Sequence, residues 1–169
     1  MLENIVQKTD GCLEGIVQLK SWNDFFETSC EITLNIGGDE GSSEITSMHE
    51  NAFVYLLENQ AYILKNILNT LFQEYPYMQE EYDYTDEEKE KFMPNIETPL
   101  EFKKLLKPKY VYLLNVAKDN MSYIGIHFAC SWDQEQEFGI MMSKNKIVSL
   151  GGADTAFLSW IAEEDLEKE

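Results

Sequence analysis

The chain has 169 residues, of which 44% are hydrophobic, and its 31 acidic and 13 basic side chains give a formal net charge of −18. This length and composition indicate one globular domain with a sizeable core and exclude a chain that is disordered throughout. The charge excludes nucleic acid as an expected partner, because phosphate binding depends on Lys and Arg side chains, and all 13 basic residues are lysines.

The acidic charge leaves two interpretations open: it attracts a basic protein and speeds encounter with it, or it serves only to keep the protein soluble. No stretch approaches the ~18 consecutive apolar residues that a membrane span needs, and the polar N-terminal sequence is unlike a signal peptide. The cysteines (Cys12, Cys30 and Cys130) are odd in number and form no CxxC motif, which is typical of free thiols in a reducing compartment. We therefore expect a cytoplasmic protein, bacterial in style, that does not bind a membrane.

Two strands are predicted near the start of the chain, at residues 13–19 and 30–36. In the second, every other residue is apolar, which is typical of a half-buried strand in an antiparallel sheet. The apolar positions are Ile32, Leu34 and Ile36. Between the strands lies a group of aromatic residues around Trp22, which we expect to close one end of the core. The glycine-rich residues 37–43 then predict a loop.

One long amphipathic helix is predicted over residues 47–74. Apolar residues recur there at spacings of three and four, which is the period of one helix face. They are Phe53, Leu56, Leu57, Ile63, Leu64, Ile67, Leu68 and Leu71. Ser47 and Glu50 have the spacing of a capping box, which predicts the first turn. Pro76 predicts the end, because the residue before a proline disfavours the helical conformation.

The following segment, residues 77–97, is acidic and rich in tyrosine. It carries seven carboxylates between Glu80 and Glu90. The tyrosines interleaved with acids here are Tyr75, just before the segment, and Tyr77, Tyr82 and Tyr84 within it. Such a mixture is typical of a protein-binding surface, since aromatic side chains are enriched at interfaces. The alternative is a lid or a mobile insertion, whose rings would pack on the core.

Two short helices are predicted next. Thr85 and Glu88 form a second capping box, which predicts a helix over residues 86–92. Thr98-Pro99 combines a capping residue with a proline at the first helical position, which predicts a helix that ends near Leu106.

The last third of the chain is rich in strands. Short turn-like links separate four predicted strands, which indicates hairpins. They are residues 110–116, 122–130, 137–142 and 146–150. Because strands and helices are segregated along the chain, the predicted fold class is α+β rather than doubly wound α/β. We expect a single domain over residues 1–169. Its antiparallel sheet, made of the two N-terminal strands plus the C-terminal four-strand meander, would pack against the long helix and the short helices.

The connection between the second and third meander strands concentrates polar side chains after Trp132. One interpretation of this loop is structural. Asp133 would accept hydrogen bonds from backbone donors, Trp132 would supply buried area, and Gly151-Gly152 would take positive φ angles where the last strand ends.

Two chemical interpretations use the carboxylates near this loop. In the first, a Ca²⁺ or Mg²⁺ ion is bound by several oxygen ligands, although their spacing matches no known calcium loop. These ligands would be Asp133, Glu135, Glu137 and Asp154. In the second, Asp133, Glu135 and Asp154 act as paired carboxylates in acid–base catalysis. A further interpretation makes the loop part of a protein-binding surface.

Other catalytic signatures are missing from the sequence. His49 and His127 lie in different predicted elements. Because His127 alternates with Ile126 and Phe128, we expect it on the opposite face of its strand, as a structural histidine. No nucleophile elbow, phosphate-binding loop, dinucleotide fingerprint or zinc-protease motif occurs. We therefore expect no cofactor and favour a protein without enzymatic activity.

Several short motifs stand out in the last third of the chain. They are YIG at 123–125, CSWDQE at 130–135, GIMM at 139–142, VSLGGADTAF at 148–157 and SW at 159–160. Together they resemble a bacterial family catalogued as domain of unknown function 6985, and the resemblance extends over most of the chain. The family loop commonly reads WDEEHGLGV, whereas this chain has Gln134 at the position of an acid and Gln136 at that of the histidine. That departure argues against a metal or catalytic role for the loop.

The resemblance implies a fold-level grouping, because the activity of the family is unassigned. Small acidic proteins of this kind also resemble, by analogy alone, the immunity proteins of bacterial toxin systems. The leading hypothesis is therefore a protein-binding domain, immunity-like in character, that captures a basic protein partner. The residues expected to face it are Tyr77, Glu80, Glu81, Tyr82, Asp83, Tyr84 and Trp132. The alternative is a divalent-metal-binding protein or a carboxylate-dependent enzyme centred on Asp133, Glu135 and Asp154.

Overall fold

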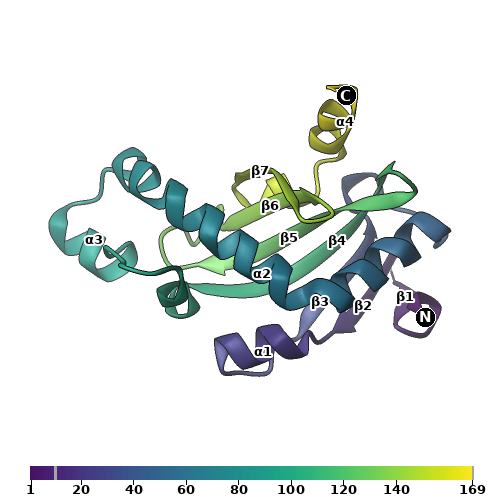
Figure 1. Ribbon diagram of the computed structural model, residues 1–169, viewed down its shortest axis with the longest axis horizontal. Helices are drawn as coiled ribbons and strands as arrows, with labels where there is room; N and C mark the ends of the chain where they lie inside the picture. Colours follow the sequence, from purple (N-terminus) through teal and green to yellow (C-terminus); the bar gives the residue numbers. More distant parts are fainter. Residues whose placement is uncertain (10, 169) are drawn as a thin grey trace.

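The computed structural model describes residues 1–9 and 11–168. Within these residues, seven strands form one sheet, in which they lie side by side in chain order (Figure 1). They are β1 (Val6–Thr9), β2 (Cys12–Val17), β3 (Ile32–Gly37), β4 (Leu106–Lys118), β5 (Met121–Cys130), β6 (Phe138–Ser143) and β7 (Lys146–Gly151). The predicted α+β class and the C-terminal meander are confirmed, and β1 is an additional edge strand.

Neighbouring strands run antiparallel except β3 and β4, which are parallel. The chain between these two strands contains the long helix, and parallel strands require a crossover connection of this kind. The sheet is thus antiparallel at every pair but this one.

The long helix α2 (Ser47–Tyr82) lies across one face of the sheet (Figure 1). Its buried side chains include Phe53, Leu56, Ile63, Leu64, Ile67, Leu68 and Leu71, which lie on the predicted apolar face. The capping box lies one residue earlier than predicted, because the backbone N–H of Thr46 donates to Nδ1 of His49 at 3.1 Å. Glu50 instead accepts a hydrogen bond from the backbone N–H of Leu2 at 3.1 Å. This bond ties the first residues of the chain to the helix.

α2 continues past Pro76, where the sequence predicted its end. A proline removes one intrahelical donor, and contacts on both sides of Pro76 hold the helix in place. The Tyr75 hydroxyl donates to the carbonyl of Pro94 at 2.8 Å, and the Gln79 side-chain amide donates to the carbonyl of Met93 at 2.9 Å. The helix ends only at Tyr82.

Shorter helices complete the fold. α1 (Lys20–Phe26) follows β2, and α3 (Asp86–Phe92) has its predicted bounds and capping box. The helix predicted after Thr98 is a short 3₁₀ helix, Pro99–Lys104. Near the C-terminus, a 3₁₀ helix (Ala153–Ala156) leads into α4 (Ser159–Glu167). Within residues 1–9 and 11–168, no helix combines the length and the apolar character of a membrane span.

The face of the sheet opposite α2 has a second, smaller core. It contains Tyr112, Leu114, Tyr123, Met141, Ala156 and Ala162. The 3₁₀ helix Ala153–Ala156 approaches β5 so closely that a Cβ atom on Gly125 would lie 1.5 Å from the carbonyl oxygen of Ala156. The absence of a side chain at Gly125 is therefore required for this packing.

Candidate functional site

The acidic, tyrosine-rich segment forms a helical hairpin, which consists of the last turns of α2 and the whole of α3. We call residues 75–92 the hairpin. In Figure 1 it lies at the end of the molecule where α2 extends beyond the sheet and α3 folds back beside it. The bonds from Tyr75 to Pro94 and from Gln79 to Met93 close the hairpin at its base. The segment is thus an ordered part of the fold.

Two tyrosines fasten the hairpin to the Trp132–Asp133 loop. The Tyr82 hydroxyl donates to Oδ2 of Asp133 at 2.8 Å, and the Tyr84 hydroxyl donates to the carbonyl of Trp132 at 2.5 Å. The two rings stack with their centroids 5.6 Å apart. The hairpin and the loop, which the sequence analysis placed on one partner-facing surface, therefore meet, and these tyrosine rings pack inward as a lid would.

The loop is arranged around Asp133. Its Oδ1 accepts the backbone N–H of Gln136 at 2.9 Å, as the structural interpretation expected. The Cys130 thiol points at the carbonyl of Asp133, with 3.5 Å between sulfur and oxygen. Burial raises the pKa of Cys130 to about 12, and burial together with the carboxylate of Asp133 raises the pKa of Tyr82. Both groups stay protonated at neutral pH, so they donate hydrogen bonds and are poor nucleophiles.

The structure corrects the role of Trp132, which the sequence analysis placed on the partner-facing surface. Its side chain is only 1% exposed. The ring packs against Tyr75, Phe102 and Phe138, with centroid distances of 5.7, 6.4 and 6.1 Å. Because a large aromatic ring gains most by full burial, Trp132 supports the loop and the hairpin from inside the core.

The carboxylates proposed for a metal or acid–base site do not share a common set of contacts. Asp133 is engaged by Tyr82 and Gln136, whereas Glu135 and Asp154 are exposed. Glu137 binds His127 instead. In the described part of the chain, no three His, Cys, Asp or Glu side chains form a group that could hold a metal ion.

The glycines at the end of β7 also differ from expectation. Neither Gly151 nor Gly152 has a positive φ angle, and φ of Gly152 is −69°. The reason for a glycine at 151 is space, since a Cβ atom there would lie 2.8 Å from Oγ1 of Thr155.

A polar cluster that the sequence analysis missed lies on the sheet face opposite α2. Nε2 of His127 and Oε1 of Glu137 are 2.9 Å apart, and the ammonium of Lys109 lies 3.2 Å from the same carboxylate. The His127 ring stacks on Tyr110, which stacks on Tyr112, with 5.5 Å between centroids in both pairs. The available signal was the pairing of β5 with β6, which sets Gly139 opposite His127 and brings Glu137 close to it.

His127 and Glu137 are both ionisable and largely buried. Burial lowers the pKa of His127, and this effect outweighs the neighbouring carboxylate, which raises it. For Glu137, burial raises the pKa, but the hydrogen bonds from His127 and Lys109 outweigh it, so the pKa is lowered. Nδ1 of His127 is buried without a hydrogen-bond partner within residues 1–9 and 11–168. His127 thus lies on the strand face opposite Ile126 and Phe128, as expected, but one of its ring nitrogens is unsatisfied.

This cluster predicts a pH dependence of stability. The folded-state pKa of His127 lies below the ordinary value of 6.5, so the unfolded chain binds more protons in mild acid. The free energy of unfolding should therefore fall as the pH decreases from 6.5 toward the lowered pKa. Urea unfolding at about pH 7.5 and about pH 5.5 measures this loss. His127→Gln should reduce this loss of stability without abolishing it. Burial also lowers the pKa of His49, so that residue contributes a pH dependence of its own. A His127→Gln protein that loses as much stability as the wild type would contradict the prediction.

The outer surface of the hairpin displays its acids. The exposed carboxylates are Glu80, Glu81, Asp83, Asp86, Glu87, Glu88 and Glu90. Tyr77 is 66% exposed on the same hairpin. Within the described residues none of these carboxylates forms an ion pair with a lysine. The hairpin thus has an inner side that fastens it to the core and an outer side with an excess of negative charge, since the seven carboxylates outnumber Lys89 and Lys91.

Comparison with known proteins places the chain in a family without an assigned activity. No curated protein and no solved structure matches the chain. The sequence model of one family, described as Domain of unknown function (DUF6985), matches residues 11–158, which include strands β2 to β7, α2 and the hairpin. The chain therefore belongs to the DUF6985 family.

Proposed function

We propose that the protein is a non-enzymatic binding domain that captures a basic protein partner on the outer surface of the hairpin. The observation that carries this proposal is the concentration of seven exposed carboxylates there, none of them paired with a lysine in the described residues. Negative charge on a surface patch attracts a positively charged partner and raises its association rate.

The way the hairpin is fastened supports this role. Tyr82 and Tyr84 hold the hairpin in one position through hydrogen bonds to the Trp132–Asp133 loop. A partner would therefore meet a preformed surface and would not have to order it, which favours affinity. The contact residues in this proposal are Glu80, Glu81 and Asp83, with Tyr77 as the exposed aromatic side chain, and Tyr82 and Tyr84 are positioning residues.

The proposal defines the partner by its chemistry, which is a cluster of Lys and Arg side chains on a folded protein. A basic bacterial toxin would be one such partner, and binding it would make this protein immunity-like. Because the contacts are exposed, binding should weaken as salt screens them.

The test is a variant in which Glu80→Gln, Glu81→Gln and Asp83→Asn remove three charges. Asn suits position 83, since Asp83 has φ 48° and Asn tolerates the left-handed conformation. Exposed ion pairs typically contribute about 0.5 kcal/mol each, so the loss of three should make a partner isolated from the source organism bind about tenfold more weakly. Calorimetry or surface plasmon resonance at about 50 and about 500 mM salt measures the change.

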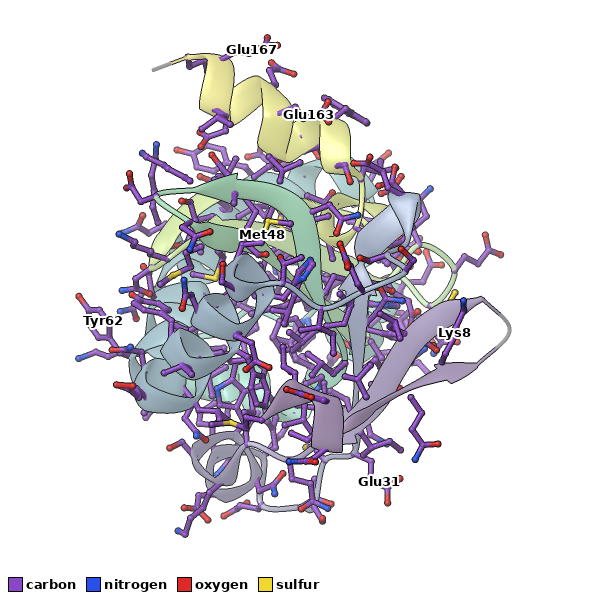
Figure 2. The ribbon with its side chains drawn as sticks, turned by 90° about the vertical axis from the view of Figure 1, so that its right-hand side faces the viewer. Lys8, Glu31, Met48, Tyr62, Glu163 and Glu167 are labelled. Carbon is purple, nitrogen blue, oxygen red and sulfur yellow. The ribbon has the colours of Figure 1, made fainter. Side chains whose placement is uncertain are left out.

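The matched control removes the same charge from another surface. Glu163, Glu164 and Glu167 are exposed on α4, where Glu163 and Glu167 project away from the sheet (Figure 2). Changing all three to Gln should leave partner binding unchanged. Equal losses for the two triple variants would show that net charge alone drives binding, and binding unaffected by salt would exclude electrostatic capture; either result contradicts the proposal.

A further inference from the structure

A groove away from the hairpin lies between α1, α2 and the 3₁₀ helix Pro99–Lys104. It encloses about 390 Å³, which is in the range of small-molecule sites. Its lining is mostly apolar, with Lys65, Ser21 and Asn69 as the polar side chains. The apolar residues are Phe25, Ala61, Leu64, Leu68, Pro99 and Leu100.

The walls of the groove are fixed by a kink in α2. Asn59 leaves the helical conformation, with φ −123° and ψ 18°. Next to it, the backbone carbonyl of Gln60 accepts a hydrogen bond from Nε1 of Trp22 at 2.7 Å. The Gln60 side chain accepts the backbone N–H of Ser21 at 2.8 Å. Because both bonds join α1 to the kink, the groove exists before any ligand binds.

The charge around the groove differs from that of the whole molecule. Lys65 is the charged side chain in its lining and is exposed, and within the described residues it forms no ion pair. Leu100 also lines an adjoining pocket of about 380 Å³, whose charged residues are Lys103, Lys104 and Glu101. Two acidic side chains in and just after α1 already form ion pairs with lysines. They are Asp24, paired with Lys20 at 3.1 Å, and Glu27, paired with Lys103 at 3.4 Å.

From this geometry we propose that the groove binds a small molecule with an apolar body and a single carboxylate, such as a medium-chain fatty acid. The carboxylate pairs with Lys65 at the rim, and the apolar body covers Phe25, Leu64 and Leu68. Leu100 is 64% exposed in the free protein, and the apolar body of the ligand would contact it in the complex. A chain with a net charge of −18 repels anions in general, so an anion binds here only because of the local lysine.

The test compares two fluorescent probes that differ in one charge. Anilinonaphthalene sulfonate is an apolar anion, and phenylnaphthylamine has the same rings without the sulfonate. The wild-type protein should bind both, and decanoate should displace both from the groove. Lys65→Met, which keeps an apolar stem, should weaken binding of the anionic probe about tenfold and leave the neutral probe unchanged.

Two further variants complete the design. Lys8→Met removes an exposed lysine from β1 and should change the affinity for neither probe. Lys8 lies far from Tyr62 in Figure 2, and Tyr62 is next in sequence to Ala61, which lines the groove. Ala61→Phe fills the groove from an exposed helical position and should abolish binding of both probes. An unchanged affinity of the anionic probe in Lys65→Met, or of either probe in Ala61→Phe, would overturn the proposal. The site shares no residue with the hairpin, so partner capture is tested independently.

Discussion

Replacing Trp132 with alanine is expected to lower the free energy of unfolding by about 3–5 kcal/mol, the range found when a buried Trp or Phe is truncated to Ala. Its ring is 1% exposed and contacts Tyr75, Phe102 and Phe138, which belong to α2, the 3₁₀ helix Pro99–Lys104 and β6. The cavity would therefore open where three elements meet. Urea denaturation followed by circular dichroism measures the loss.

The same substitution should loosen the hairpin before the rest of the protein unfolds. The carbonyl of Trp132 holds the Tyr84 hydroxyl, so a shift of the loop weakens the attachment. Native-state hydrogen exchange should then be faster at residues 75–92 than in β5. Tyr84→Phe, which leaves the core intact, should reproduce this local effect with a smaller loss of global stability.

Trp160→Ala is the matched control, because Trp160 is 56% exposed on α4. Its free energy of unfolding should stay within about 0.5 kcal/mol of the wild type, as is usual for surface positions. If Trp132→Ala destabilised the protein no more than Trp160→Ala does, the buried position of the Trp132 ring would be refuted.

A second large effect is expected from Gly125→Ala in β5. The added Cβ atom would lie 1.5 Å from the oxygen and 2.5 Å from the carbon of the Ala156 carbonyl group. Inserted atoms in a packed core typically destabilise by about 1–3 kcal/mol, and we expect about 3 kcal/mol or more here, because the obstacle is backbone that cannot change rotamer. The 3₁₀ helix Ala153–Ala156 would have to move away from the sheet and carry the start of α4 with it.

Gly152→Ala tests the same segment without the clash. Gly152 has φ −69°, and the nearest atom to its added Cβ would be Oδ1 of Asp154 at 3.4 Å. Stability should be unchanged or higher by up to about 1 kcal/mol, because alanine restricts the unfolded chain. Chemical denaturation of the two variants in parallel decides the matter. A Gly125→Ala protein as stable as Gly152→Ala would rule out the close contact with Ala156.

Local signals in the sequence predicted local structure well. The capping box at Thr85 and Glu88 is decided by neighbouring residues, and it is present in the structure. The alternation in β3 predicted the strand but not its surroundings, because β3 is buried on both faces, Asn35 included, and pairs in parallel with β4. The end of α2 was misplaced, because Pro76 is a local signal that tertiary bonds from Tyr75 and Gln79 override. The strand β1 is only four residues long, too short for a periodic pattern.

The candidate site was predictable in composition and not in geometry. The sequence shows tyrosines among acids, but the distance from Tyr82 to Asp133 is set by packing between residues 51 positions apart. The same holds for His127 and Glu137, which only the register of β5 and β6 brings together. Grouping the carboxylates by their closeness in sequence therefore placed Glu137 with the wrong neighbours.

The parallel pairing of β3 with β4 has a consequence for how the chain folds. β3 cannot complete its hydrogen bonds until β4 is available, and all the residues from 38 to 105 lie between them. Closing so long a loop is entropically unfavourable, whereas the hairpins from β4 to β7 form between near neighbours. The meander should therefore nucleate folding. During synthesis on the ribosome, the edge of β3 that pairs with β4 stays unpaired until β4 has been synthesised. During that interval the unpaired edge of β3 should favour aggregation of the nascent N-terminal half.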